Sequence, residues 1–318
     1  MASAHPVPKP AAATHPEQAY LALMQTIWTQ GDERVDRTGI GTRAIFGAML
    51  RWDLADGAMP LLTTKRVYWK TATRELLWFL TGDTNIRPLV LQGVKIWNEW
   101  PHARYVRETG EAIALDDFVA RIADDPAFAE KWGDLGPVYG KQWVDWPTWR
   151  YRKDGLYEPG PGINQIAVVI DGLRRDPAGR RHIIEGWNVA ELDRMALPPC
   201  HKSYQFHVAD GRLSCALYQR SCDVALGLPF NLWSAALLTR MIAQQTGFAP
   251  GELVWMGGDV HLYLNHAGLI EEQLARTPVG NPTLEIVRQP DSIFDYRIDD
   301  FVVHGYEPAG AIKAPVAV

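Results

Sequence analysis

Cys200 is the residue whose setting most suggests chemistry. It follows Pro198 and Pro199 in the stretch LPPCH, and two prolines restrict the backbone just before the thiol. A lone thiol is most often a small buried hydrophobe, and Cys215 fits that description because apolar neighbours share its face of a predicted strand. Cys222 has no comparable feature. The restricted setting of Cys200 therefore favours a reactive thiol over a packing role.

A β-hairpin is predicted to bring an arginine close to this thiol. Polar and apolar residues alternate on both sides of Asp210-Gly211, which is a two-residue turn signal. The register that this turn sets places His201 opposite Arg220. Cys200 then lies opposite Ser221, one residue from the guanidinium. A nearby cation favours the thiolate and lowers a cysteine pKa by roughly one to several units, which makes the sulfur a nucleophile.

The elements that must hold this hairpin are a mixture of helices and strands. No regular strand–helix–strand alternation is present, which predicts an α+β fold: a single domain built on a mixed β-sheet flanked by helices. Apolar residues at helical spacing predict helices over residues 17–31, 67–82, 163–176 and 234–247, and strands are expected within 36–50, 180–189 and the hairpin.

The chain divides into a tail, a catalytic domain and an insertion. Residues 1–15 are Ala/Pro-rich without a continuous apolar core, so we expect a flexible tail and no secretory signal. Residues 16–318 form one predicted catalytic domain. Within it, residues 101–131 are helical, charged and interrupted by Pro126, which indicates a helical insertion that tolerates change and takes no part in catalysis.

The composition limits the kinds of partner that the protein can be expected to bind. The 318 residues carry a formal net charge of −5 and a pI of about 6.0, which does not suit a broad polyanion-binding face. No apolar run approaches membrane-spanning length, and the three cysteines are sparse and odd in number, so we expect a cytoplasmic protein. An RNA-binding regulator is the alternative from another class. The acidic balance disfavours it as the main role, and a secondary messenger-RNA interaction stays open.

Seven motifs in this order along the chain resemble the thymidylate synthase family, and they cover about residues 17–318. They are DRTGIGT, RELLWFLTGDTNI, GDLGPVYGKQW, LPPCH, YQRSCDVALGLPFN, GGDVHLYLNH and IKAPVAV. The resemblance implies that family's fold and its methyltransferase reaction. In that reaction dUMP receives a methyl group from 5,10-methylenetetrahydrofolate, which also donates the hydride, and dTMP and dihydrofolate are formed. It also implies a homodimer that uses no metal.

The resemblance assigns three residues to the chemistry. Cys200 is the thiolate that adds to C6 of the pyrimidine, Tyr139 assists removal of the C5 proton, and Glu75 passes protons to a uracil carbonyl through water. Apolar neighbours of Glu75 would raise its pKa. Periodicity alone leaves Glu75 equally compatible with a solvated helix face and Tyr139 with a core aromatic. The remaining catalytic assignments are Arg220, Asn231 and Asp223.

The resemblance also implies a nucleotide pocket. Asn231 reads the uracil ring, and His261 and Tyr263, two apart on a predicted strand and so on one face, hold the deoxyribose 3′-hydroxyl. His261 and His266 face opposite ways, which disfavours a metal pair. Guanidinium groups bind the phosphate, with Arg180 and Arg181 supplied by the neighbouring subunit. The full set is Arg37, Arg180, Arg181, Gln219, Arg220, Ser221, Asp223, Asn231, His261 and Tyr263.

The folate site implied by the resemblance is mostly apolar. Asp223 hydrogen-bonds the pterin, Lys65 serves the glutamate tail, and the terminal IKAPVAV closes over the ligands as a lid. The remaining residues of this set stack on the rings or line the pocket and would otherwise be read as core. The set is Lys65, Ile96, Trp97, Trp100, Leu197, Asp223, Gly227, Phe230, Val316 and Ala317.

Three positions depart from the family pattern: Glu185 in IIEGWN, Trp233 after Asn231, and Asn98 in IWNEW. None removes a catalytic group, and each bears on the folate pocket or the subunit contact. A nucleotide hydroxymethylase is the rival enzyme, because it shares the cysteine and folate but lets water quench the intermediate. Asn231 suits uracil, and Trp97 with the terminal lid excludes water, so both favour methylation.

Overall fold

The computed structural model describes residues 15–35 and 39–315, and its centre is a six-stranded sheet in the order β1-β2-β8-β7-β6-β5. β7 runs parallel to β8, whereas the other neighbouring strands are antiparallel. The sheet is therefore mixed, which confirms the predicted α+β class. The strands span Asp32–Arg34 (β1), Thr42–Asp53 (β2), Ile183–Glu185 (β5), His201–Ala209 (β6), Arg212–Asp223 (β7) and Ala249–Tyr263 (β8).

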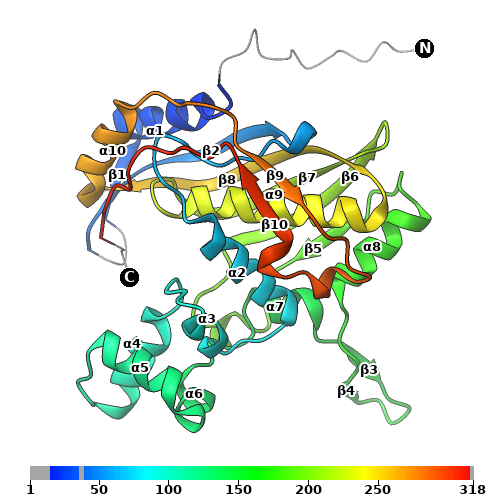
Figure 1. Cartoon of the computed structure of the whole chain (residues 1–318). Helices are drawn as coiled ribbons and strands as arrows, with labels where there is room; N and C mark the ends of the chain where they lie inside the picture. Colours follow the sequence, from blue (N-terminus) through cyan, green and yellow to red (C-terminus); the bar gives the residue numbers. More distant parts are fainter. Residues whose placement is uncertain (1–14, 36–38, 316–318) are drawn as a thin grey trace.

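Helices cover one face of this sheet. α9 lies across that face (Figure 1) and is buried around most of its circumference, as expected of a helix enclosed on several sides. α9 begins earlier than the sequence predicts, because Pro229 lies in the first turn, where its missing N–H costs nothing. The helices of this layer are α1 (Gln18–Gln30), α2 (Trp69–Thr81), α7 (Tyr139–Val144), α8 (Gln165–Arg175), α9 (Gly227–Thr246) and α10 (Ala267–Leu274).

The predicted insertion is a small helical cluster at the pole of the molecule below the sheet (Figure 1). Pro126 does interrupt the helical segment: it begins α6, and Asp125 caps that helix by accepting a hydrogen bond from the backbone N–H of Phe128, 3.0 Å away. Tyr105, Phe118 and Phe128 pack edge to face or tilted in the interior of the cluster. The predicted insertion, residues 101–131, takes in most of α4 (Glu99–Thr109), α5 (Leu115–Asp124) and most of α6 (Pro126–Trp132), while α3 (Arg87–Leu91) joins the cluster from before it.

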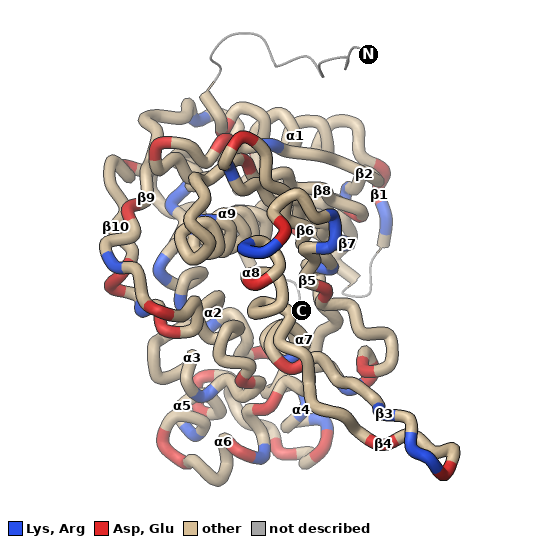
Figure 2. The backbone as a smooth tube through the Cα atoms, turned by 90° about the vertical axis from the view of Figure 1, so that its right-hand side faces the viewer, with Lys and Arg blue, Asp and Glu red and all other residues tan. Residues whose placement is uncertain are grey.

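Two small hairpins and several 3₁₀ turns were not anticipated from the sequence. One hairpin projects from the body (Figures 1 and 2), with the exposed rings of Tyr151 and Tyr157 in contact on one face, 5.3 Å apart. The strands are β3 (Trp149–Tyr151), β4 (Tyr157–Pro159), β9 (Thr283–Ile286) and β10 (Phe301–His304). The 3₁₀ turns are Ala55–Gly57, Leu192–Arg194, Leu264–His266, Ile293–Asp295 and Ile298–Asp300.

The β6–β7 hairpin corrects one prediction. Asp210 and Gly211 form the turn, and the predicted register holds as far as Ser203. It then shifts, so that His201 pairs with Gln219 and the predicted pairing of His201 with Arg220 is wrong. A β-bulge between His201 and Ser203 adds one residue to β6, and the alternating pattern carries no signal of it.

Among residues 15–35 and 39–315, no element covers the sheet face opposite α9. Met49, Met256 and Tyr218 form a row across β2, β8 and β7 on that face, because they are register partners. Met49 is 58% exposed and Tyr218 37%. Contiguous apolar surface on a soluble protein commonly marks an interaction site. This face is thus a candidate subunit contact.

Candidate active site

The sheet topology gathers three motifs at one end. Because β7 and β8 run parallel, Asp223 pairs with His261 and Ser221 with Asp259. Cys200 immediately precedes β6, whose first residues pair with the end of β7. The segments LPPCH, YQRSCD and GGDVHLY therefore meet at the same sheet edge, although they are far apart in sequence. This edge is the candidate active site.

Arg220 holds the turn that carries Cys200. As a consequence of the bulge, the backbone N–H of Arg220 donates to the Cys200 carbonyl, 2.9 Å away, so Cys200 lies opposite Arg220 and not opposite Ser221 as predicted. The guanidinium donates through Nε to the Pro199 carbonyl at 2.9 Å and through Nη2 to the Pro198 carbonyl at 2.8 Å. Three of its five N–H groups remain for another acceptor. The guanidinium is thus bonded to the two residues that precede Cys200, and its proximity to the thiol itself stays a prediction.

Tyr139 contacts the same turn from α7. Its hydroxyl accepts a hydrogen bond from the backbone N–H of Cys200, 2.7 Å away, and its ring packs on Phe79 of α2 with centroids 4.8 Å apart. Burial, reinforced by the nearby charge of Cys200, raises the pKa of Tyr139 well above its ordinary value. Tyr139 therefore stays a phenol whose proton is available beside the thiol.

Glu75 is buried and not solvated, so the structure distinguishes the two readings that periodicity left open. Its side chain, on α2, is 8% exposed, and its Oε1 accepts a hydrogen bond from the indole Nε1 of Trp97, 2.7 Å away. Burial raises the pKa of Glu75 from 4.5 to about 7, and the Trp97 hydrogen bond opposes that rise. A carboxyl with such a pKa can gain and lose a proton near neutral pH.

Asn231 lies in the first turns of α9 and joins a hydrogen-bonded chain. Its Oδ1 accepts from Gln219 Nε2 at 2.9 Å. His201, which the sequence analysis used only as a neighbour of Cys200, also hydrogen-bonds Asn231, and burial lowers the pKa of His201 to about 4. His201 is therefore neutral at pH 7, and its Nδ1 lies 3.0 Å from the Tyr204 hydroxyl. In the sequence, only its position next to Cys200 indicated that His201 could belong to the site.

His261 and Tyr263 share a face of β8, as predicted, with ring centroids 5.4 Å apart. Asp259, which the sequence analysis missed, orients His261: its Oδ1 lies 3.0 Å from His261 Nδ1, while its Oδ2 accepts from Arg34 at 2.8 Å. The spacing of an aspartate two residues before a histidine on one strand face is the signal that would have found it.

Of the other arginines predicted to bind phosphate, Arg180 and Arg181 lie in a loop away from the Cys200 turn. Arg37 lies outside the described residues. Arg180 and Arg181 are exposed in the loop between α8 and β5, and neither guanidinium bonds to that turn among the described residues. Ser221 is half-buried on β7, with its carbonyl accepting from Gln219 at 3.1 Å.

The residues expected to contact folate fall into two groups. Ile96, Trp97 and Trp100 precede or begin α4, with the two indoles 5.4 Å apart, while Leu197 and Phe230 are half-buried near Pro198 and in α9. Lys65, Asp223 and Gly227 lie around the start of α9. Gly227 begins the helix. Val316 and Ala317 lie outside the described residues.

Two charged members of the folate set are held by backbone groups at the start of α9. Asp223 Oδ1 accepts from the N–H groups of Ala225 and Leu226, at 2.9 and 3.3 Å. Lys65 is buried, its ammonium donates to the Ala225 carbonyl, and burial lowers its pKa to about 8. The amine thus faces the interior in this structure.

The three positions that depart from the family pattern have structural partners. Glu185 forms an ion pair with Lys202, 3.3 Å apart, at the edge strand β5. Trp233 is fully buried and donates to the Thr73 hydroxyl at 2.9 Å, which ties α9 to α2. Asn98 is buried where α4 begins. Of these three, only Asn98 adjoins the tryptophans of the folate set.

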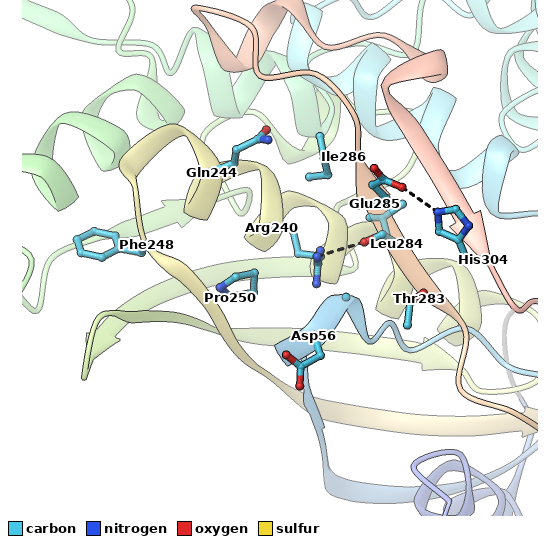
Figure 3. Close-up of a pocket in the computed structure, with 11 residues that line it drawn as sticks. Asp56, Arg240, Gln244, Phe248, Pro250, Thr283, Leu284, Glu285, Ile286 and His304 are labelled. Carbon is cyan, nitrogen blue, oxygen red and sulfur yellow. Dashed lines mark hydrogen bonds and ion pairs between the residues drawn. The ribbon is translucent and has the colours of Figure 1, made fainter.

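A cavity of about 500 Å³ lies elsewhere, between α9, β9 and the turn at Asp56 (Figure 3). Arg240 crosses it and donates to the carbonyls of Leu54 and Leu284, at 2.8 and 3.2 Å, so its guanidinium serves packing. None of the predicted site residues lines it, and its lining contains no cysteine. Within residues 15–35 and 39–315, no group of three or more metal-ligating side chains is placed to hold an ion, and no helix is long and apolar enough to span a membrane.

Fold and site together are those of an enzyme: a cysteine lies at one end of a mixed sheet, with a buried carboxyl whose pKa is about 7 and hydrogen-bonded polar side chains near it. Residues 18–318 match the family model described as thymidylate synthase. Proteins named thymidylate synthase from Novosphingobium aromaticivorans and Sphingopyxis alaskensis are 69% and 64% identical over 305 and 306 residues. These matches cover 96% of this chain and 97% and 98% of the relatives.

The chain belongs to the thymidylate synthase family. It is accordingly a methyltransferase that converts dUMP to dTMP with 5,10-methylenetetrahydrofolate as both one-carbon and hydride donor, and it releases dihydrofolate.

Proposed function

We propose that Cys200 is the nucleophile of this reaction. Its thiolate forms a bond to C6 of dUMP, and the C5–C6 electron pair moves toward O4 as an enolate, which makes C5 nucleophilic. The observation that carries the proposal is the turn itself. Tyr139 and the backbone and guanidinium of Arg220 all hold residues 198–200, so the backbone that carries the thiol is positioned before substrate arrives.

Glu75 and Tyr139 move the protons. Glu75, with its pKa of about 7, supplies a proton toward the uracil O4 and takes it back as the enolate collapses. The Tyr139 phenol, hydrogen-bonded to the Cys200 N–H, assists loss of the C5 proton once C5 has bonded to the folate methylene. The buried aromatic rings of Phe79 and Trp97 beside both groups keep bulk water away, so hydride and not water completes the methyl group.

The nucleotide is recognised at its three parts. Asn231 pairs with the uracil edge and Asp223 and Gln219 support it, while His261 and Tyr263 bind the 3′-hydroxyl. The phosphate is bound by Arg220 through the N–H groups that the proline carbonyls leave unused, together with Ser221 and Arg37.

The exposed Arg180 and Arg181 complete the phosphate site of a partner subunit. The uncovered sheet face with its row of Met49, Met256 and Tyr218 supports this homodimer, since that face would otherwise leave apolar surface in water.

Folate binds over the nucleotide against Trp97 and its neighbours. The set comprises Lys65, Ile96, Trp97, Trp100, Leu197, Asp223, Gly227, Phe230, Val316 and Ala317, and no metal takes part. The described end of the chain supports a terminal lid, because the Pro315 carbonyl lies 2.8 Å from Nε2 of buried His266, next to Tyr263. We place the enzyme in the cytoplasm, with residues 1–15 as a tail and 101–131 as an insertion outside the chemistry.

Purified protein incubated with dUMP and 5,10-methylenetetrahydrofolate tests these roles. Dihydrofolate is followed by absorbance and the nucleotide by mass. We expect dTMP and dihydrofolate in equal amounts, and neither from Cys200→Ser. Hydroxymethyl-dUMP with tetrahydrofolate would retain the nucleophile but refute the exclusion of water, and turnover by Cys200→Ser would refute the nucleophile.

A further inference from the structure

The base that Asn231 reads depends on which way its amide faces. The two ends of an asparagine amide have nearly the same shape, but one accepts hydrogen bonds and the other donates them. Uracil offers a carbonyl oxygen at C4 and an N–H at N3, whereas cytosine offers an amino group and a bare ring nitrogen. One orientation of Asn231 therefore suits uracil, and the opposite orientation suits cytosine equally well.

A chain of hydrogen bonds leads from Asn231 to Trp255 in the core. Trp255 Nε1 donates to Gln219 Oε1 at 2.8 Å, and Gln219 Nε2 donates to Asn231 Oδ1 at 2.9 Å. An indole nitrogen can only donate, so it admits only the oxygen of Gln219. Gln219 Nε2 also donates to the Ser221 carbonyl, which can only accept. Both fixed partners thus require the same orientation of Gln219.

We propose that Trp255 is a specificity-determining positioning residue, which through Gln219 holds Asn231 in the orientation that reads uracil and rejects cytosine. This inference rests on the proposed role of Asn231 in base recognition. With Asn231 reversed, its NH₂ would face Gln219 Nε2, two donors in opposition. Gln219 is 2% exposed and Trp255 is fully buried, so bulk water does not reach the Gln219 amide to replace the lost hydrogen bond.

Gly257 leaves space for the indole ring of Trp255. Trp255 lies on β8 two residues before Gly257, which pairs with Gln219 across the parallel β7–β8 ladder. A Cβ at position 257 would lie 2.4 Å from Cη2 of Trp255. A glycine is therefore needed at position 257 for the Trp255 ring to reach Gln219.

The test is Trp255→Phe, which keeps an aromatic ring but removes the N–H. The measured quantity is the Ki of dCMP, as a competitor, divided by the KM of dUMP. We expect this ratio to fall about tenfold, because reversal of Asn231 is then opposed by fewer fixed hydrogen bonds. The matched control is Trp233→Phe, which removes another fully buried indole N–H, the one bonded to Thr73. We expect it to lower Tm and leave the ratio unchanged.

A folded Trp255→Phe protein with the wild-type ratio would overturn the proposal. So would a fall in the ratio of equal size in Trp233→Phe, because the effect would then be general loosening. If Trp255→Phe does not fold, Gln219→Met takes its place. It removes the donor that Asn231 Oδ1 requires at similar side-chain length, and an unchanged ratio there would equally refute the proposal. A wild-type enzyme that does not distinguish dUMP from dCMP would instead contradict the assigned role of Asn231.

Discussion

The Glu75 carboxyl links catalysis to folding stability. Because burial raises its pKa from 4.5 to about 7, the folded protein retains a proton that the unfolded chain loses between those two values. The unfolded state therefore binds fewer protons in that range, and stability falls as the pH rises through it. The stabilising contribution is complete below pH ~4.5 and lost above pH ~7. The raised pKa that suits Glu75 to proton transfer thus lowers the folding stability of the protein at neutral pH.

Replacing Glu75 by glutamine removes that cost. Between pH ~4 and ~8, we expect the free energy of unfolding of Glu75→Gln to rise relative to wild type by about 3 kcal/mol, the energy of a shift from 4.5 to about 7. Urea denaturation across this pH range measures it. Glu108→Gln, at an exposed helical position, is the control and should track wild type. A pH-independent difference between Glu75→Gln and wild type would contradict this, because it would mean that the pKa of the Glu75 carboxyl is the same in the folded and the unfolded protein.

At the scale of elements, the β6–β7 bulge and Arg220 together set the position of the nucleophile. The bulge moves Cys200 opposite Arg220, and the planar guanidinium then bonds to two consecutive proline carbonyls. A lysine ammonium is a point donor and cannot reproduce that fork. The turn is therefore specified by geometry and not by charge alone.

Arg220→Lys separates these two contributions. We expect kcat to fall about 100-fold, because small displacements of a nucleophile have effects of that size. We also expect slower alkylation of Cys200 by iodoacetamide in the nucleotide-free protein, where no phosphate is present. Arg212→Lys is the control, since Arg212 bonds to the Pro250 carbonyl and Asp53 at the other end of β7. Wild-type alkylation in Arg220→Lys would restrict Arg220 to phosphate binding.

At the scale of the whole molecule, the active site is predicted to be shared between subunits. Co-expression of Cys200→Ser with Arg181→Ala tests this, because only a mixed dimer then contains one intact site. Random pairing predicts about one quarter of wild-type activity. If Arg181 served its own subunit, every site would be defective and the mixture would be as inactive as its components. Sedimentation of each variant verifies that dimers are present.

The sequence predicted the parts of this structure that rest on local rules. Asp210-Gly211 specified the hairpin, and helical spacing located α1, α2 and α8. The bulge at Lys202 was missed because it interrupts the alternation without a glycine or proline. The burial of Glu75 depends on Trp97, which comes from a different element, and so periodicity could not decide it.

The roles of Trp255 and His201 could not be predicted from the sequence for a related reason. A buried tryptophan or histidine has the same local signature whether or not its N–H orients a distant amide. The β3–β4 hairpin lies in a stretch rich in proline and glycine, which obscures short strands, and β9 and β10 are only four residues long each. Most features that the sequence did not predict thus depend on residues that are far apart in sequence but adjacent in the structure.

The most direct test of the central claim is the mass of the protein during turnover. Enzyme mixed with dUMP and 5,10-methylenetetrahydrofolate is quenched in acid within the first turnovers, and its intact mass and peptides are measured. We expect a nucleotide adduct on the peptide that contains Cys200, absent from Cys200→Ser and from samples without dUMP. An adduct on Cys215 or Cys222, or dTMP formation by Cys200→Ser, would contradict it.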